Sequence, residues 1–143
     1  MKTLAGNGKK GDDTDILATE GSLHQPSKIC AASNRDVYIA DTNSNKIKKV
    51  THSDGYLTTI AGNNNDDATH NDATVVLTGA TALDIKLNKP EGIYYDEDND
   101  DVYFSDTENH RVLRVNSGGA VDTIAGNGAC ATNTNTGDAT SIS

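Results

Sequence analysis

Short apolar runs separated by polar turns make up most of this chain, and within the runs apolar and polar residues alternate with a period of two. That period is typical of strands half-buried in a sheet, whereas a helix repeats its apolar positions about every 3.6 residues. Four runs predict strands in the first half of the chain, at residues 28–30, 37–40, 46–50 and 56–61. Four more follow at residues 92–95, 101–105, 111–115 and 120–125. Because Asn, Asp, Gly and Ser dominate the connections, each set of four predicts an antiparallel meander.

The distribution of charge along the runs predicts their burial. The run 46–50 alternates Lys46 and Lys48 with apolar residues, so we expect it to be half exposed. The first run of each set carries the least charge and should be the most buried. Phe104 and Ile39 occupy the same alternating place on the second runs and should face a neighbouring sheet, while Asp100 in a polar hairpin should face solvent.

The two sets of runs belong to an internal repeat. TLAGNG at residues 3–8 returns as TIAGNN at 59–64 and as TIAGNG at 123–128. Between these marks, QPSKIC at 25–30 matches KPEGIY at 89–94, and DVYIADTNSNKIKKV at 36–50 matches DVYFSDTENHRVLRV at 101–115. A repeat of about 60 residues with four antiparallel strands describes one blade of a β-propeller. The expected fold class is therefore all-β, built from propeller blades.

These marks resemble the NHL repeat of six-bladed propellers, over about residues 3–128. The resemblance implies that the chain holds an incomplete ring, because closed propellers have about four to eight blades. It also implies a docking role, since the family is used mostly for docking. Some similar propellers are lyases or hydrolases that hold calcium or zinc on the axis, and some NHL propellers bind RNA.

We expect one propeller segment over residues 1–143, which divides as follows: a lone outer strand at 1–5, a blade with its lead-in loop at 6–61, a second such blade at 62–125, and a loop leading to a further blade at 126–143. Two blades leave apolar sheet faces uncovered. We therefore expect a homo-oligomer, such as a trimer in which residues 1–5 complete a blade of another copy, or part of a longer propeller.

The candidate site residues lie where the second runs end. Asp41 with Asn45, and Asp106 with Asn109, predict structural turns in which the carboxylate caps backbone N–H groups of the tight turn to the third strand. His110 is assigned to the place of Lys46 and to a packing role. His24 and Asn88 stand two residues before the prolines of the repeat and are candidates for the rim of the central channel.

Acidic loops raise the question of a metal. Residues 62–72 and 96–101 offer carboxylates to a hard cation such as calcium, but neither has the ligand spacing of a calcium loop. We interpret both as solvated turns and expect no cofactor. Cys30 and Cys130, 100 residues apart, are interpreted as free thiols, Cys30 as a small buried one, although a disulfide between them is an alternative.

Composition narrows the function. Thr, Asp, Asn, Gly and Ser fill 71 of the 143 positions and Trp is absent, which disfavours a helical bundle. A net charge of −9 argues against nucleic-acid and anionic membrane partners. No signal peptide or spanning segment is apparent, and the sequence indicates no compartment. The favoured function is a non-enzymatic scaffold or binding module that engages a protein, peptide or glycan through loops between blades. A metal-dependent lyase or hydrolase, and a structural subunit of a repetitive assembly, are the alternatives.

Overall fold

The computed structural model describes residues 2–63 and 76–128, which form two antiparallel sheets of five strands each. The all-β fold class is confirmed, and the described residues contain 3-10 turns but no α-helix. The strands of the first sheet are β1 (Ile16–Leu17), β2 (Lys28–Ala31), β3 (Val37–Asp41), β4 (Lys46–Val50) and β5 (Tyr56–Ala61). Those of the second are β6 (Ala80–Thr81), β7 (Pro90–Asp96), β8 (Asp101–Asp106), β9 (Arg111–Val115) and β10 (Ala120–Ala125). The 3-10 turns are η1 (Thr42–Ser44), η3 (Ala82–Asp84) and η4 (Thr107–Asn109).

Each sheet is the expected four-stranded meander with one short strand added. The strand orders are β1-β5-β4-β3-β2 and β6-β10-β9-β8-β7. The register repeats with the sequence: Ile39 pairs with Ile29 and Lys48, and Phe104 pairs with Ile93 and Leu113. The two sheets are therefore equivalent blades, and β1 and β6 come from the lead-in loop of their own blade.

A lone outer strand was expected at residues 1–5, but residues 2–5 do not form a strand. The Gly6 N–H donates to the Ala18 carbonyl at 2.8 Å, and the Gly62 N–H donates to the Ala82 carbonyl at 2.9 Å. Residues 2–6 therefore contact the lead-in loop of the first blade in the same way that the end of β5 contacts the lead-in loop of the second blade. A strand also needs a hydrogen-bonded neighbour. Strand β5 is hydrogen-bonded to β4, but among the described residues no strand lies beside residues 2–5.

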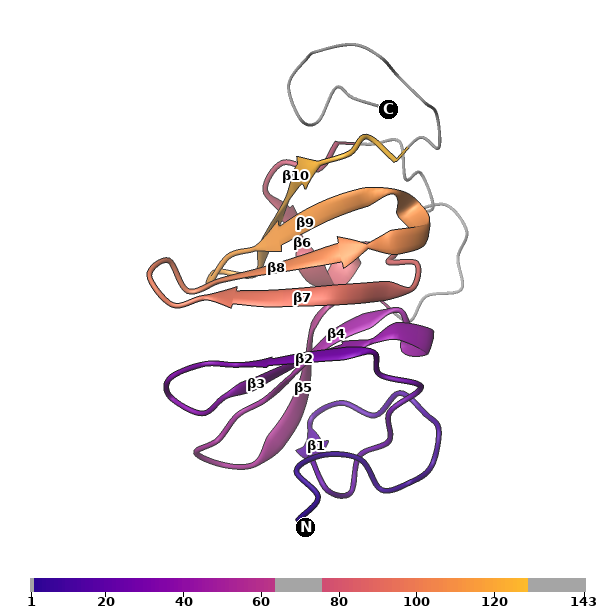
Figure 1. Ribbon diagram of the computed structural model, residues 1–143, viewed down its shortest axis with the longest axis vertical. Coiled ribbons are helices and arrows are strands. Elements are labelled where there is room, and N and C mark those ends of the chain that lie inside the picture. Colours follow the sequence, from indigo (N-terminus) through magenta and orange to yellow (C-terminus); the bar gives the residue numbers. More distant parts are fainter. Residues whose placement is uncertain (1, 64–75, 129–143) are drawn as a thin grey trace.

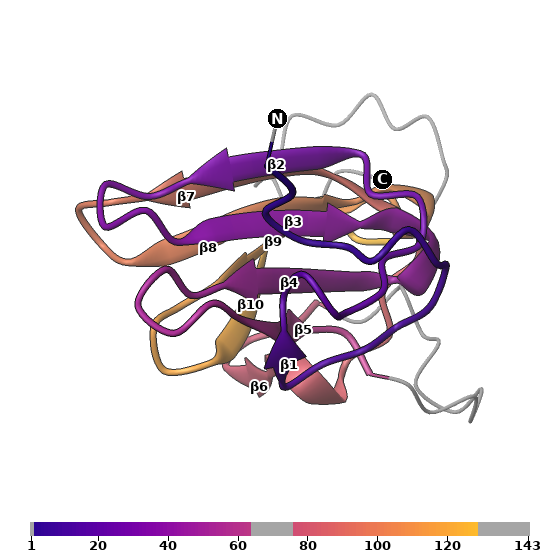
Figure 2. The same cartoon turned by 90° about the horizontal axis from the view of Figure 1, so that it is seen from below.

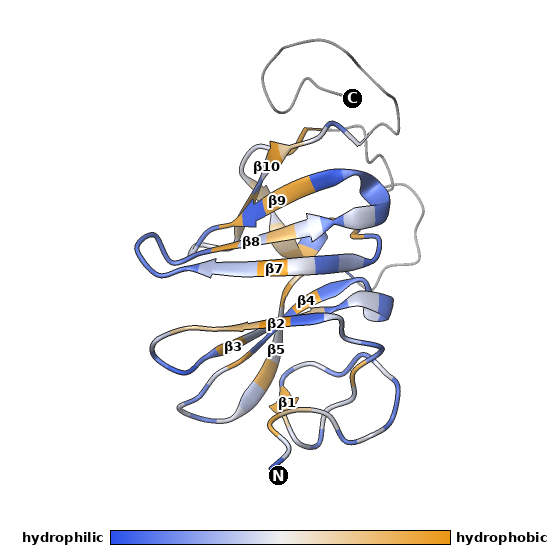
Figure 3. Cartoon of the chain, viewed as in Figure 1, coloured by the Kyte–Doolittle hydropathy of each residue, from blue (hydrophilic) through white to orange (hydrophobic). Residues whose placement is uncertain are grey.

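The blades stack face to face, as Figures 1 and 2 show, with β2 and β3 against β7. One apolar core joins them: Tyr38, Ala40, Ile47 and Ala61 come from the first sheet, and Val102, Phe104, Leu113, Val115 and Val121 come from the second. A smaller cluster with Ile39 and Leu57 covers the opposite face of the first sheet. Hydrophobic residues concentrate on the strands and hydrophilic ones on the hairpins and on the turns η1 and η4 (Figure 3). Phe104 faces the neighbouring sheet, as expected, whereas Ile39 is buried on the face of the first sheet that points away from the second.

Two burial expectations are wrong. β3 is buried at every residue, whereas β2 is exposed at three of its four residues. The reason is that β2 is an edge strand with one neighbour, while β3 has strands on both sides. β4 is almost wholly buried, including Lys46 and Lys48, because ion pairs compensate both ammonium groups.

Candidate functional site

The two strand-end aspartates bind the loop that precedes the first strand of their blade. Asp41 Oδ1 accepts from the His24 N–H at 2.7 Å, and Asp106 Oδ1 accepts from the Asn88 N–H at 2.7 Å. The His24 carbonyl in turn accepts from the Asn43 N–H at 3.0 Å. The expected cap on the following turn is wrong, since neither aspartate makes a side-chain cap bond to η1 or η4. The carboxylates instead satisfy N–H groups that the fold takes away from water.

The expected equivalence of Asn45 and Asn109 is also wrong, because the turn is aligned one residue differently. Asn45 and His110 are the matching residues: both end a 3-10 turn in the left-handed region, at φ of 54° and 50°. His110 therefore does not take the place of Lys46, which Arg111 occupies opposite Asp106. Asn45 Oδ1 accepts from the Lys89 N–H at 2.8 Å and so links the blades, whereas Asn109 donates to Asp106 at 2.9 Å.

The charges around the two aspartates differ. Lys48 Nζ lies 3.4 Å from Asp41 Oδ2 and 3.2 Å from Asp12 Oδ1, and it donates to the Asp13 carbonyl at 2.7 Å. Arg111 Nε donates to Asp106 Oδ2 at 2.9 Å. Burial raises the pKa of Asp106, against the hydrogen bonds from Asn88, Asn109 and Arg111 that lower it. The sequence signal for the buried lysine was its counterpart, Leu113, which marks position 48 as inward-facing.

The acidic hairpin 96–101 satisfies itself with local hydrogen bonds. Asp96 accepts from the Asp98 N–H at 3.0 Å and from Asn99 Nδ2 at 2.8 Å, and these bonds lower the Asp96 pKa. Asp100 accepts from the Tyr95 hydroxyl at 2.7 Å, so it is more than a solvated turn residue. Apart from Gly62 and Asn63, the acidic loop 62–72 lies outside the described residues.

Three further features of the described residues concern metal binding, the cysteines and membrane crossing. Within residues 2–63 and 76–128, no group of three or more His, Cys, Asp or Glu side chains could hold a metal ion. Cys30 is a free, half-buried thiol whose pKa is raised by burial, and Cys130 lies outside the described residues. No helix in the described part has the length and apolar character that a membrane crossing requires.

His24 lies on the wall of an open cavity of about 670 Å³ formed with residues 3–10 and with Gln25. Asn88 contributes its backbone to the Asp106 bond described above. The two residues are therefore equivalent anchors of their loops. Their place at the rim of a central channel stays a prediction.

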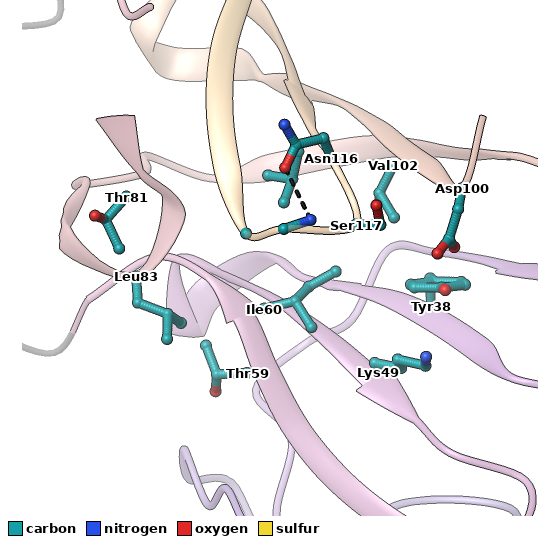
Figure 4. Close-up of a pocket in the computed structure, with 13 residues that line it drawn as sticks. Tyr38, Lys49, Thr59, Ile60, Thr81, Leu83, Asp100, Val102, Asn116 and Ser117 are labelled. Atoms are coloured by element: carbon teal, nitrogen blue, oxygen red, sulfur yellow. Dashed lines mark hydrogen bonds between the residues drawn. The ribbon is translucent and has the colours of Figure 1, made fainter. Parts of the chain in front are cut away.

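The cavity between the blades was not expected from the sequence. It has a volume of about 390 Å³, and strand β5 and the β9–β10 hairpin contribute to its lining (Figure 4). Its apolar wall includes Ile60, Leu83 and Val102, and its polar lining includes Lys49 and Asn116. Lys49 Nζ lies 2.8 Å from Asp36 and 5.5 Å from the centre of the Tyr38 ring. The cavity exists because two blades meet, which no run of sequence displays.

Comparison with known families agrees with this architecture. A family model described as the NHL repeat matches residues 23–50 and residues 87–119, one segment in each blade. Each of the two blades is thus similar to an NHL repeat over the matched segment. The propeller-blade fold is thereby shown, and it is a fold that suits binding and scaffold modules in general. The search of curated proteins found no match to this sequence.

Solved structures resemble the two blades at low sequence identity. A structural genomics protein of unknown function from Bacteroides thetaiotaomicron is 21% identical, with a TM-score of 0.53 over 74% of this chain and 25% of that chain. A putative phosphatase from the same organism is 19% identical, with a TM-score of 0.51 over 83% of this chain and 25% of that chain. Virginiamycin B lyase from Staphylococcus aureus is 18% identical, with a TM-score of 0.46 over 69% and 26%. The chain thus spans about a quarter of the length of these structures.

Proposed function

We propose that this chain is a binding module whose cavity between the NHL blades receives an apolar side chain presented by a protein or peptide. The observation that carries the proposal is the cavity of about 390 Å³, within the range of about 300–1,000 Å³ that is usual for ligand pockets. A loop residue, Leu83 of η3, forms part of its wall and is 49% exposed. Covering such a side chain with a ligand favours binding, because its apolar surface is removed from water.

The polar groups around the cavity favour an uncharged occupant. The Lys49 ammonium is held by Asp36 at 2.8 Å, and Asn116 Oδ1 accepts from the N–H groups of Gly118 and Ala120 at 3.0 Å each. Both groups are engaged within the chain, so the apolar wall, together with the Thr59 hydroxyl that has no hydrogen-bond partner among the described residues, is what a ligand can use. A peptide fits better than a glycan, because the Tyr38 ring is almost wholly covered and cannot stack on a sugar.

No observation on the described residues favours a lyase, a hydrolase or a structural subunit over a binding module. A pure scaffold role differs from the proposal in one respect. It would not need the cavity to be occupied.

The proposal is tested with peptides. A random peptide library is selected on the immobilised chain, and the dissociation constants of the enriched peptides are measured by fluorescence anisotropy. We expect enriched peptides to share an apolar residue and to bind Leu83→Asp at least about tenfold more weakly, which corresponds to about 1.4 kcal/mol. Leu17→Asp is the matched control, because Leu17 is similarly exposed at 41% and lies outside the cavity lining.

Two results would contradict the proposal. The first is enrichment of no peptide at all. The second is enrichment of peptides that bind Leu83→Asp and the parent chain equally, which would place their site elsewhere.

A further inference from the structure

The face of the second sheet that points away from the first sheet carries exposed apolar side chains, which no other part of residues 2–63 and 76–128 covers. We call it the upper face, and its apolar members are Tyr94, Tyr103, Val112 and Ile124. Tyr94 is 63% exposed, and Val112 and Ile124 are 37% exposed each. The Tyr94 and Tyr103 rings lie 6.5 Å apart and are tilted by 44°.

The chain itself shows what covers such a face. In the first blade the counterparts of these four residues are Cys30, Tyr38, Ile47 and Ile60. All four belong to the core between the blades or pack against it. What covers them is the near face of the second blade. The upper face of the second blade therefore corresponds to the face of the first blade that packs against the second blade.

The other side of that interface is repeated on the first sheet, on the face turned away from the second sheet. We call this the lower face. Ile29 on it is 64% exposed, whereas its counterpart in the second blade, Ile93, packs against the core between the blades. The lead-in loop over the lower face holds the same hydrogen bonds as the lead-in loop between the blades, at Gly6–Ala18 and Gly62–Ala82.

Side-chain sizes on the two open faces are complementary. Between the blades the small Cys30 meets the Tyr95 backbone, and the Tyr95 ring stacks on Tyr38 with centroids 4.8 Å apart. On the open faces the large and small residues exchange places. Tyr94 stands in the place of Cys30, and Ala31 stands in the place of Tyr95. One small and one large residue would again meet, so the packing volume is kept.

Charge on the upper face is neutralised in the same way as between the blades. Arg114 lies 2.7 Å from Asp122 and 3.4 Å from Asp101. Its counterpart at the covered face, Lys49, pairs with Asp36 at 2.8 Å. Burial of the upper face would therefore not leave the Arg114 guanidinium without an ion-pair partner.

We propose that the upper face of the second blade binds the lower face of the first blade of a second copy, repeating head to tail the interface within the chain. A heterologous contact of this kind closes a ring or continues as a filament. Residues 2–5 lie against the first lead-in loop in the way that the end of β5 lies against the second. In the assembly, the end of β10 of the neighbouring copy would take this same place. Residues 2–5 must therefore move aside. The proposal does not depend on the peptide cavity.

The test uses light scattering on the full chain and on two variants that spoil opposite faces, Tyr94→Asp and Ile29→Asp. We expect the parent chain to exceed its single-chain mass of 15.0 kDa and each variant alone to remain at that mass. An equimolar mixture of the two variants keeps one intact pair of faces, so it should form a dimer and nothing larger. Leu83→Asp, outside both faces, should assemble like the parent chain.

Circular dichroism checks that each variant is folded, and Tyr94→Lys and Ile29→Lys replace any variant that is not. Deleting residues 1–5 should raise the assembled fraction. A parent chain of single-chain mass at every concentration overturns the proposal. So does assembly of Ile29→Asp without a partner variant, since that would mean that upper faces pair with each other. Weaker assembly on deletion of residues 1–5 overturns the arrangement as well, because it would show this segment completing a blade of the other copy.

Discussion

At the scale of single residues, the least expected feature is a lysine that is wholly buried. Lys48 stands where the second blade has Leu113, so its position is one that the fold reserves for an inward-facing side chain. Its ammonium is compensated by Asp41, Asp12 and the Asp13 carbonyl. The second blade satisfies Asp106 differently, through Arg111 and Asn109. The same carboxylate at the end of the second strand is thus held by two different sets of donors.

The first prediction removes this ammonium. Lys48→Leu copies the second blade but leaves Asp41 buried without a positive partner, so we expect a loss of about 3–5 kcal/mol in the free energy of unfolding. The double variant Asp41→Asn/Lys48→Leu should recover most of that loss, because Asn keeps an oxygen for the His24 N–H. Urea denaturation followed by circular dichroism measures both. A double variant no more stable than Lys48→Leu would show that the lost packing, not the stranded carboxylate, sets the cost.

At the scale of strands and hairpins, a second carboxylate fastens two hairpins of the first blade together. Asp36, at the end of the β2–β3 hairpin, accepts from the His52 N–H of the β4–β5 hairpin at 2.8 Å and pairs with Lys49 at 2.8 Å. Burial acts to raise the Asp36 pKa, but the bonds from Lys49, His52 and Asn34 outweigh it, so the pKa is lowered. The hairpin contact is therefore a source of acid sensitivity.

The second prediction concerns pH. A pKa that is lower in the folded state contributes stability that is fully present above the unfolded value of about 3.9 and is lost as the pH falls through the folded value. Asp36→Asn should therefore lower the free energy of unfolding by about 1–3 kcal/mol at pH 7. The difference from the parent chain should shrink below about pH 4. Urea denaturation across this range measures it. A difference that is constant with pH would exclude the ion pair as its cause.

At the scale of the whole molecule, the two blades form one cooperative unit because they share a core. Phe104 lies in that core between the sheets and is 2% exposed. Polar contacts close the seam between the blades at both ends: the Thr42 hydroxyl donates to the Pro90 carbonyl at 2.8 Å, and the Ser33 hydroxyl donates to Glu97 at 2.6 Å. We expect neither blade to unfold without the other.

The third prediction follows from this shared core. Phe104→Ala should cost about 3–5 kcal/mol, a large part of the about 5–15 kcal/mol that stabilises a typical domain. Asp98→Ala, at an exposed position of the β7–β8 hairpin, is the control. It is preferable to Asp100→Ala, because Asp100 accepts a hydrogen bond from the Tyr95 hydroxyl. The control should change stability by less than about 0.5 kcal/mol. Tyrosine fluorescence and circular dichroism during urea denaturation measure both, and equal midpoints for the two variants would refute the placement of Phe104.

The sequence could predict those strands and turns of the blades that depend on residues close together in the chain. The period-two runs and the repeated turn residues predicted all eight meander strands, because alternation and turn chemistry act between near neighbours. They did not predict β1 or β6, two-residue strands that exist only because a lead-in loop meets the outer strand of its blade. The pairing of Asn109 with Asn45 was an error that the sequence itself could have corrected, because the ungapped match of residues 36–50 to residues 101–115 already sets Asn45 opposite His110.

By itself, the sequence determined the fold class, the repeat and the strands, since each of these depends on residues close together in the chain. Tertiary structure alone decided which carboxylates pair with Lys48, that Asp41 and Asp106 bind His24 and Asn88 rather than their own turns, and that a cavity lies between the blades. It also decided which apolar faces are covered. These properties depend on residues that are distant in the chain and meet only when the sheets stack, so their energies leave no local pattern to recognise.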